Sequence, residues 1–228
     1  MALTFTPRAG VSIMHGSSLD DTLRSLRLLE LSGDLDLTAV VGIREGDPHR
    51  SALVDGMRGR GTILPIVPTA SDAEAHNAVL TELVRRDVQY VWTLRPELVI
   101  GSWTLGVLTK HMTAVPDCAV VGARIMRFAE PQPLIWSDGG TVSVNGSVKR
   151  LSAGLSRRQA PKAKPVDVDA VHRAGSLYRV AALQTVGLFG DDDEVDGHDV
   201  GWSDRARQAG WRVMVQRRAR PQLEGVNG

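Results

Sequence analysis

The chain has 228 residues, of which 43% are hydrophobic and 23% charged, and its formal net charge is +1. Such a chain forms one large globular domain or two small ones, and its low net charge provides no general attraction for nucleic acid or for an acidic partner. The single cysteine, Cys118, excludes an internal disulfide and fits a reducing compartment. The first ten residues lack the apolar core of a signal peptide, and no stretch approaches the roughly eighteen apolar residues of a membrane span. We therefore expect a soluble, cytoplasmic protein.

The first half of the chain alternates between apolar strands and amphipathic helices. A strand at 11–14, a helix at 19–31 capped by Ser17 or Ser18, and a strand at 37–43 form a β–α–β unit. Residues 44–61 are polar and glycine-rich, and we expect a loop there with one helical turn at most. The alternation predicts an α/β sandwich around a mostly parallel sheet. Its later members are strands at 63–67, 88–94 and 118–125, a helix that starts at Ser71 with Glu74 as a capping-box partner, and a helix at 103–115.

The second half is richer in short strands and tight turns. Residues 149–164 contain six basic side chains and no acidic one. We expect a solvated loop there; a nucleic-acid patch is disfavoured because no aromatic residue interleaves the charges, and a lid that closes over a phosphate is the alternative. The remaining predicted elements are short antiparallel strands at 134–136 and 141–144, strands at 166–171, 176–180 and 211–215, and a short helix at 181–186.

The stretch 183–211 concentrates the polar chemistry of the chain. Five acidic residues lie between Asp191 and Asp196, and the pair His198–Asp199 then precedes a short helix that ends at Gly210. A carboxylate at a helix start, beside a histidine and an acidic loop, is suited to proton transfer. The alternatives are a plain N-cap at Asp199 and a solvated acidic loop before it.

The order and spacing of several motifs resemble those of the family 2 glycosyltransferases, and most closely their rhamnosyltransferase-like branch. The resemblance covers residues 10 to 220. Three positions depart from the family pattern: Gly42 stands where the family has its first nucleotide-contacting Asp, Arg95-Pro96-Glu97 replaces the Asp-x-Asp signature, and His198 replaces a Glu. The matching segments are Val11–Ser18, Val40–Asp47, Asn77, Leu94–Glu97, Gly139–Gly140, Val168–Val171, Arg179, Val186–Asp191, His198–Val200, Arg205 and Ala209–Trp211.

The resemblance implies a single GT-A domain over residues 1–228, with a nucleotide-sugar-binding half at about 10–125 and an acceptor-binding half at about 126–220. It implies an inverting transferase that moves a sugar, in this branch a deoxysugar such as rhamnose, from a nucleotide-diphosphate donor to an acceptor hydroxyl. The alternative is a catalytically degenerate subunit that binds or serves as a scaffold, and the missing Asp residues favour it. A nucleotidyltransferase is disfavoured, because no Gly-rich phosphate loop follows the first strand. The acceptor and the oligomeric state are open.

The resemblance also implies catalytic roles. Asp199 aligns with the family's catalytic Asp and is the predicted general base, provided that its side chain faces the cleft, and His198 would tune it. Glu97 is the one carboxylate left at the metal signature and would be the ligand of Mg²⁺ or Mn²⁺. Arg95 offers another way to neutralise phosphate, which makes a metal dispensable; an exposed strand end without a role is its alternative.

The turn His15-Gly16-Ser17 and the loop Gly42–Asp47 follow neighbouring strands. They are the expected nucleoside contacts, because open α/β sheets bind ligands at the carboxyl ends of their strands. A structural role is the alternative for His15, and a core position is the alternative for Trp202. The predicted nucleotide-sugar contacts are His15, Gly16, Ser17, Gly42, Arg44, Asn77 and Arg95, and the predicted acceptor contacts are Asp196 and Trp202.

Overall fold

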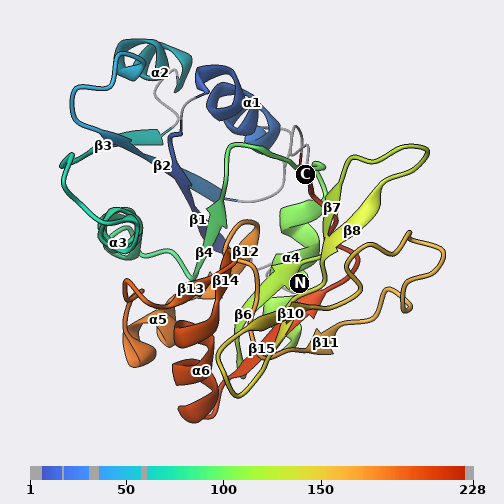
Figure 1. The fold of residues 1–228 in the computed structure, drawn as a ribbon. Helices are drawn as coiled ribbons and strands as arrows, with labels where there is room; N and C mark the ends of the chain where they lie inside the picture. The colour runs from blue at the N-terminus through green and yellow to red at the C-terminus, as the bar shows by residue number, and fades with distance from the viewer. Residues whose placement is uncertain (1–6, 17, 31–35, 58–60, 224–228) are drawn as a thin grey trace, which may run out of the picture.

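The computed structural model describes residues 7–16, 18–30, 36–57 and 61–223 (Figure 1). An eight-stranded sheet lies at its centre, in the order β11-β15-β6-β12-β4-β1-β2-β3. All its strands run parallel except β11 and β12, each antiparallel to its neighbours. The mostly parallel sheet predicted from the alternating pattern is therefore present. The strands are β1 (Arg8–Met14), β2 (Asp36–Arg44), β3 (Gly61–Ile66), β4 (Tyr90–Leu94), β6 (Cys118–Ala123), β11 (Val166–Asp167), β12 (Ser176–Arg179) and β15 (Arg212–Gln216).

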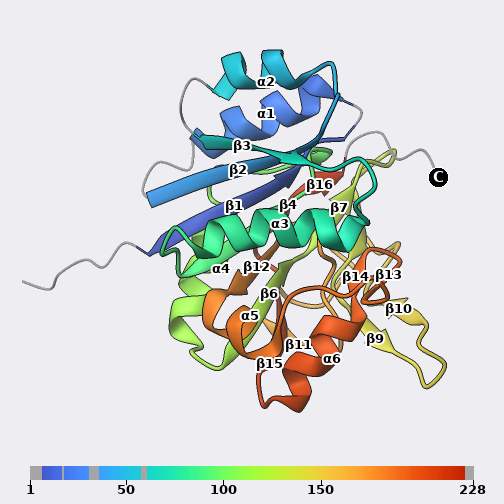
Figure 2. The same cartoon turned by 90° about the vertical axis from the view of Figure 1, so that its left-hand side faces the viewer.

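Helices cover both faces of this sheet (Figure 2). One apolar core joins α1 (Leu19–Glu30), α2 (Arg50–Met57) and α4 (Thr104–Ala114) to one face. A second core joins the other three helices to the opposite face. Sheets covered in this way bury apolar side chains on both sides, which explains why β4 and β6 are buried along their whole length. The helices of the second face are α3 (Asp72–Val84), α5 (Val180–Val186) and α6 (Val200–Gln208).

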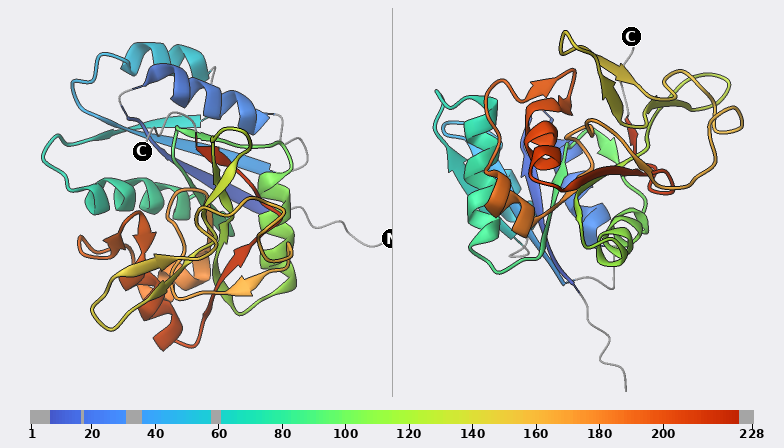
Figure 3. Two further views of the ribbon diagram at one scale, coloured as in Figure 1. Left: turned by 45° about the vertical axis from the view of Figure 1, so that its right-hand side comes forward. Right: turned by 90° about the horizontal axis from the view of Figure 1, so that it is seen from below.

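Three small sheets complete the second half. The β9–β10 hairpin, in yellow, lies at the other end of the molecule from α1 and α2 (Figure 3). The order of the largest is β5-β16-β7-β8, and the other two are the hairpins β9–β10 and β13–β14. Their strands are β5 (Leu98–Val99), β7 (Ile125–Arg127), β8 (Leu134–Ser137), β9 (Gly140–Val142), β10 (Val148–Arg150), β13 (Glu194–Val195), β14 (His198–Asp199) and β16 (Gln222–Leu223).

Two helix starts, those of α1 and α3, follow their predicted caps. The Ser71 hydroxyl accepts from the Glu74 N–H at 3.1 Å, and the Glu74 carboxylate accepts from the Ser71 N–H at 2.8 Å, so the capping box at α3 is confirmed. Ser18 caps α1 by accepting from the Asp21 N–H at 3.1 Å. The alternative cap, Ser17, lies outside the described residues. No helix in the described part of the chain is long and apolar enough to cross a membrane.

Two sequence-based predictions of local structure are wrong. Residues 44–61 contain the two-turn helix α2, which buries Leu53 and Met57. These two residues have the spacing of a helix, but a pattern of only two apolar positions is too short to be recognised in the sequence. The strand expected at 166–171 ends at Asp167, because the chain then leaves the large sheet. Ala170 pairs there with Gly140, through N–H to carbonyl bonds of 2.9 and 3.2 Å.

The strand expected at 118–125 is divided at Arg124. This side chain is buried and donates to both oxygens of Asp138, at 2.8 and 2.7 Å. Its partner also accepts from Arg217 at 2.9 Å. Because buried charges need such partners, the ion pair fixes the point where the chain passes from β6 of the large sheet to β7 of a small one. Cys118 is a buried residue of β6.

Candidate functional site

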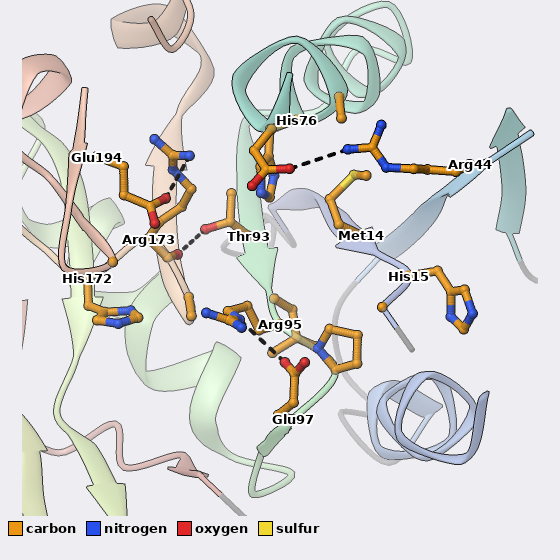
Figure 4. Close-up of a pocket in the computed structure, with 17 residues that line it drawn as sticks. Met14, His15, Arg44, His76, Thr93, Arg95, Glu97, His172, Arg173 and Glu194 are labelled. Carbon is orange, nitrogen blue, oxygen red and sulfur yellow. Dashed lines mark hydrogen bonds and ion pairs between the residues drawn. The ribbon is translucent and has the colours of Figure 1, made fainter. Parts of the chain in front are cut away.

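A cavity of about 280 Å³ opens where β1 and β4 end (Figure 4). The parallel strands bring their carboxyl ends to the same edge of the sheet, which is where open α/β sheets bind ligands. Its volume is near the lower end of the about 300–1,000 Å³ that small-molecule sites enclose. The wall is formed by residues 14–16, Arg44, Asp72, Ala75, His76, 93–97, 172–174, Glu194 and Gly197.

Three side chains in this wall carry buried polar atoms without a hydrogen-bond partner: Nδ1 of His76, Nδ1 of His172 and Nη2 of Arg173. Burial, assisted by nearby cationic Arg173, lowers the pKa of His76 to about 4. Burial, with a contribution from His198, lowers the pKa of His172 to about 3. Both imidazoles are therefore neutral at pH 7. Buried polar atoms are nearly always satisfied in folded proteins, so three unpartnered ones in the wall residues distinguish this cavity from the apolar core.

Two carboxylates hold Arg173 in place. Its Nε donates to Asp199 Oδ1 at 2.5 Å, and its Nη1 pairs with Glu194 Oε2 at 2.8 Å. The guanidinium also lies over the Phe189 ring, 4.3 Å from the centroid. The Thr93 hydroxyl fixes the backbone by donating to the Arg173 carbonyl at 2.5 Å. A guanidinium so fixed presents Nη2 in one orientation, which suits an anionic group of a ligand.

Asp199 occupies the N-cap position of α6, but its side chain makes no capping hydrogen bond. It is fully buried, and its two oxygens accept from Arg173 and from the Tyr178 hydroxyl. Burial raises the pKa of Asp199 to about 6, against the opposing effects of these two partners. The plain-cap interpretation is therefore wrong. The condition for a base, a side chain that faces the cleft, is not met either, because Asp199 is not among the residues of the cavity wall.

Glu194 is the carboxylate of the acidic run that reaches the cavity. It lies on β13, directly opposite Asp199 in the β13–β14 hairpin, and its side chain is 41% exposed. Asp196 and Gly197 form the turn with φ of 49° and 76°. At Gly197 a Cβ atom would lie 2.4 Å from His172 Nε2, so only glycine fits. Glu194 was not predicted as a site residue, although Asp-Gly is a strong hairpin signal that locates the turn after it.

Other members of the acidic run bind protein groups rather than solvent alone. The Ser71 hydroxyl donates to Asp191 at 2.5 Å, which connects the run to the start of α3. Asp193 is buried and accepts from Arg205 at 2.6 and 2.9 Å and from the Gly190 N–H at 2.7 Å. The solvated-loop alternative is therefore wrong for Asp193, whereas Asp191 is exposed. The contacts instead fasten the hairpin that carries Glu194.

Arg95 and Glu97 both line the cavity and form an ion pair of 3.4 Å (Figure 4). Among the described residues, the one group of three potential metal ligands within 4.8 Å of one another does not include Glu97. A cation at Glu97 would have one carboxylate and would compete with the adjacent guanidinium for it. The residues at the end of β4 therefore do not fit a Mg²⁺ or Mn²⁺ ion.

Four of the predicted nucleotide-sugar contacts, His15, Gly16, Arg44 and Arg95, lie in the cavity wall. Ser17 is outside the described residues, and the other two predicted contacts lie behind the wall. A Cβ atom at Gly42 would approach Met14 Sδ to 2.6 Å, so Gly42 is a close-packing position. The Asn77 amide bonds the Phe189 backbone, donating to its carbonyl at 2.8 Å and accepting from its N–H at 3.0 Å.

The remaining predicted residues surround the cavity without entering its wall. His198 is buried, with Nε2 2.9 Å from the Ser137 hydroxyl oxygen and its ring centroid 5.1 Å from that of His172. Trp202 is a core residue that donates to the Gly187 carbonyl at 2.8 Å, so its predicted acceptor contact is replaced by the core alternative. Asp196 lies in the exposed hairpin turn.

No protein-family model matches the sequence, and no curated protein matches it significantly. The structure is nevertheless similar to solved glycosyltransferases. It matches a crystal structure of GalNAc-T7 with UDP, GalNAc and Mn²⁺ at a TM-score of 0.74 and 12% identity, over 96% of this chain and 44% of that chain. It matches the mannosyltransferase PcManGT from Pyrobaculum calidifontis, in complex with GDP-Man and Mn²⁺, at a TM-score of 0.66 and 14% identity, over 99% and 59% of the two chains.

A third match is a crystal structure of S. aureus TarS 1-349 in complex with UDP-GlcNAc, at a TM-score of 0.61 and 13% identity, over 97% and 59% of the two chains. The present chain thus spans about half the length of the solved structures it matches. Together these similarities show that the chain has the GT-A fold, which was predicted from the motif order. Fold alone does not fix chemistry, which has to be argued from the cavity.

Proposed function

We propose that the protein transfers a sugar from a nucleotide-diphosphate donor to an acceptor hydroxyl in the cavity at the ends of β1 and β4. The observation that carries this proposal is a cavity at the carboxyl ends of the strands whose wall brings together two arginines, Arg95 and Arg173, and a half-exposed carboxylate, Glu194. The three similar structures, which are complexes with UDP, GDP-Man and UDP-GlcNAc, support this class of ligand.

The donor's diphosphate would bind to the arginines Arg95 and Arg173 of the wall. Arg173 is fixed with Nη2 unpaired, and the side chain of Arg95 is 58% exposed. Guanidinium groups form strong bidentate hydrogen bonds with phosphate oxygens. Such groups stabilise the negative charge that develops on a departing diphosphate. Transfer on this basis needs no metal at Glu97. This agrees with the position of Glu97 beside the Arg95 guanidinium, which repels a cation.

Glu194 would be the general base of an inverting transfer. Its carboxylate takes the proton of the acceptor hydroxyl while the acceptor oxygen forms a bond to the anomeric carbon. The bond from that carbon to the donor phosphate breaks, and the nucleoside diphosphate leaves with the electron pair. Asp199, the base predicted from the sequence, would act as a positioning residue that holds Arg173. The resemblance to rhamnosyltransferases makes a dTDP-deoxysugar the first donor to test.

Paired amide substitutions in the acidic run test the base. Glu194→Gln keeps the shape of the side chain and removes its basicity, so kcat should fall by about 10²- to 10⁴-fold. Asp192→Asn is the matched control, because Asp192 is exposed in the same run outside the cavity wall. Equal kcat values for Glu194→Gln and the wild type would refute the assignment.

The scaffold alternative makes a different prediction. A non-catalytic subunit would keep the fold without needing buried polar atoms that lack partners, which cost about 1–3 kcal/mol each. Its signature would be donor binding without any transfer to a panel of hydroxyl acceptors, or no donor binding at all. Release of nucleoside diphosphate in the presence of an acceptor would exclude it.

A further inference from the structure

A second group of polar side chains lies beside the cavity, at the ends of β1 and β2. His15 follows β1, whereas Asp47 and His49 lie in the segment between β2 and α2. One potential ligand atom from each of the three lies within 4.8 Å of the other two. The His15 side chain is fully buried, and those of Asp47 and His49 are 23% and 34% exposed. The group is therefore sheltered yet accessible from one side.

The distances in this group match the edges of a metal coordination polyhedron. His15 Nε2 lies 3.1 Å from His49 Nδ1 and 3.8 Å from Asp47 Oδ2. His49 Nδ1 lies 3.6 Å from Asp47 Oδ1. Ligand atoms about 2.0–2.1 Å from a tetrahedral zinc ion are about 3.3–3.4 Å apart. An ion could therefore enter with shifts of a few tenths of an ångström.

The outer contacts of the group orient its lone pairs inward. The Thr22 hydroxyl donates to the Ser18 carbonyl at 3.2 Å, so it accepts from His15 Nδ1 at 2.8 Å. That leaves His15 Nε2 as a lone pair. A histidine ligand whose other nitrogen donates to an oxygen is the usual arrangement at a metal site.

Asp47 is oriented in the same way. Its Oδ1 accepts from the backbone N–H of His49 at 2.8 Å. That leaves Oδ2, which lies 3.8 Å from His15 Nε2, available for a metal ion. Its negative charge would offset part of the charge of a divalent ion. We propose that His15, Asp47 and His49 bind a divalent transition-metal ion of the zinc class, through His15 Nε2, His49 Nδ1 and an Asp47 oxygen, with a further coordination position open.

The ligand set specifies the metal. Two imidazoles and one carboxylate suit Zn²⁺, Ni²⁺ or Co²⁺, whereas Mg²⁺ prefers oxygen ligands. This site differs in residues and in strand from the metal signature at the end of β4. His15 also belongs to the cavity wall, with its ring turned away from the other labelled wall residues (Figure 4). The proposal stands independently of the transfer reaction.

Isothermal titration of the full chain, without a histidine tag and after treatment with a chelator, tests this site with Zn²⁺ alone. We expect one ion per chain and no binding of Mg²⁺. His49→Gln and His15→Gln each remove one ligand and should weaken Zn²⁺ binding by roughly 100-fold or more. Thr22→Val changes only the outer contact and should weaken binding by about 10–100-fold. Asp55→Asn, at an exposed position of α2, is the control and should bind as the wild type does.

Far-ultraviolet circular dichroism and melting curves without metal show that each variant is folded before titration. Thr22→Val keeps the volume of the buried side chain and leaves all three ligands in place, so it tests the site even where a ligand variant unfolds. No Zn²⁺ binding to the wild type would overturn the proposal. So would Zn²⁺ binding that is equally tight in the wild type and in a folded His15→Gln or His49→Gln variant.

Discussion

Two groups of histidines lie at one edge of the same sheet, and their surroundings differ in charge. His15 and His49 contact each other beside a carboxylate, Asp47. His76 and His172 are instead surrounded by arginines, with Arg173 and Arg95 both acting to lower a histidine pKa. A neutral imidazole can bind a metal or donate to an anion, so its neighbours decide its use. The comparison indicates a cation site at the cavity edge and an anion site inside the cavity.

The two groups also differ in how completely they are bonded. Each ring of the His15 group has a protein partner, such as the Thr22 hydroxyl. In the other group, Nδ1 of both His76 and His172 has none in the part of the chain that the structure describes. Sites that await a ligand keep such unpaired atoms at a cost in stability. Variants that change the charge or the hydrogen bonding of only one of the two groups therefore test whether the groups differ in this way.

The largest effect is expected from removing the positive charge of the anion site. Arg173→Met leaves the fully buried Asp199 without its ion-pair partner, so the free energy of unfolding should fall by about 3–5 kcal/mol. Urea unfolding monitored by tryptophan fluorescence measures this change. Arg173→Met/Asp199→Asn should recover part of the loss, since the unpaired charge is gone. A single variant as stable as the wild type would contradict the ion pair's role.

Acid should destabilise the protein through the same group. The folded pKa values of His76 and His172, about 4 and about 3, lie below the ordinary value of 6.5. The unfolded chain thus binds more protons below pH 6.5, and stability is lost as pH falls through that window toward 4. Asp199, with its raised pKa of about 6, opposes this trend. We expect a net loss of at least about 2 kcal/mol between pH 7 and pH 4.

Urea unfolding at a series of pH values checks this expectation, and His76→Gln should flatten the curve by removing one of the buried imidazoles. A curve that is flat for the wild type, or identical in the variant, would show that His76 does not titrate as described.

A smaller effect is expected at the end of β4. Arg95→Met removes an exposed guanidinium from the cavity wall, so binding of a nucleoside diphosphate should weaken by about 1.5–3 kcal/mol, the value of a hydrogen bond to a charged group. Titration calorimetry with and without Mn²⁺ measures it. If nucleoside diphosphate bound only with Mn²⁺ present, and Glu97→Gln abolished that binding, a metal ion at Glu97 would be required. The arginine-based account of this strand end would then be wrong.

The smallest effect is expected at the start of α3, the helix that carries His76. Ser71→Ala removes the capping hydroxyl and its bond to Asp191, and the free energy of unfolding should fall by about 1 kcal/mol. Urea unfolding measures the loss, and Ser143→Ala, in the exposed loop between β9 and β10, should have a smaller effect. A loss no larger than that of the control would mean that the capping box does not stabilise α3.

The sequence predicts the fold well because its strands and helices are local patterns. Apolar runs such as 88–94 coincide with buried strands, and the Ser71–Glu74 capping box marks a helix start within four residues. The helix α2 was missed because it buries only two apolar side chains on its inner face, Leu53 and Met57. Local patterns thus predict the architecture, but they do not predict an element such as α2 that is stabilised by only one or two contacts with the core.

The site could be predicted only in part because its geometry depends on long-range pairs. Asp199 was located from motif order, but its partners Arg173 and Tyr178 are 26 and 21 residues away along the chain, and they bury it. Whether a carboxylate faces a cleft or an arginine is not encoded in spacing. Glu194 was hidden in an acidic run, although the Asp-Gly turn after it predicts the hairpin.

The claim most directly open to test is that the cavity binds a nucleotide-diphosphate sugar. Melting temperatures of the wild type are to be measured with a panel of UDP-, GDP- and dTDP-sugars, alongside Arg95→Met. One donor at about 100 times its Kd should stabilise the wild type by about 2.7 kcal/mol, and Arg95→Met should lose most of that gain at the same concentration. If no donor in the panel raised the melting temperature of the wild type at millimolar concentration, the proposed function would be contradicted.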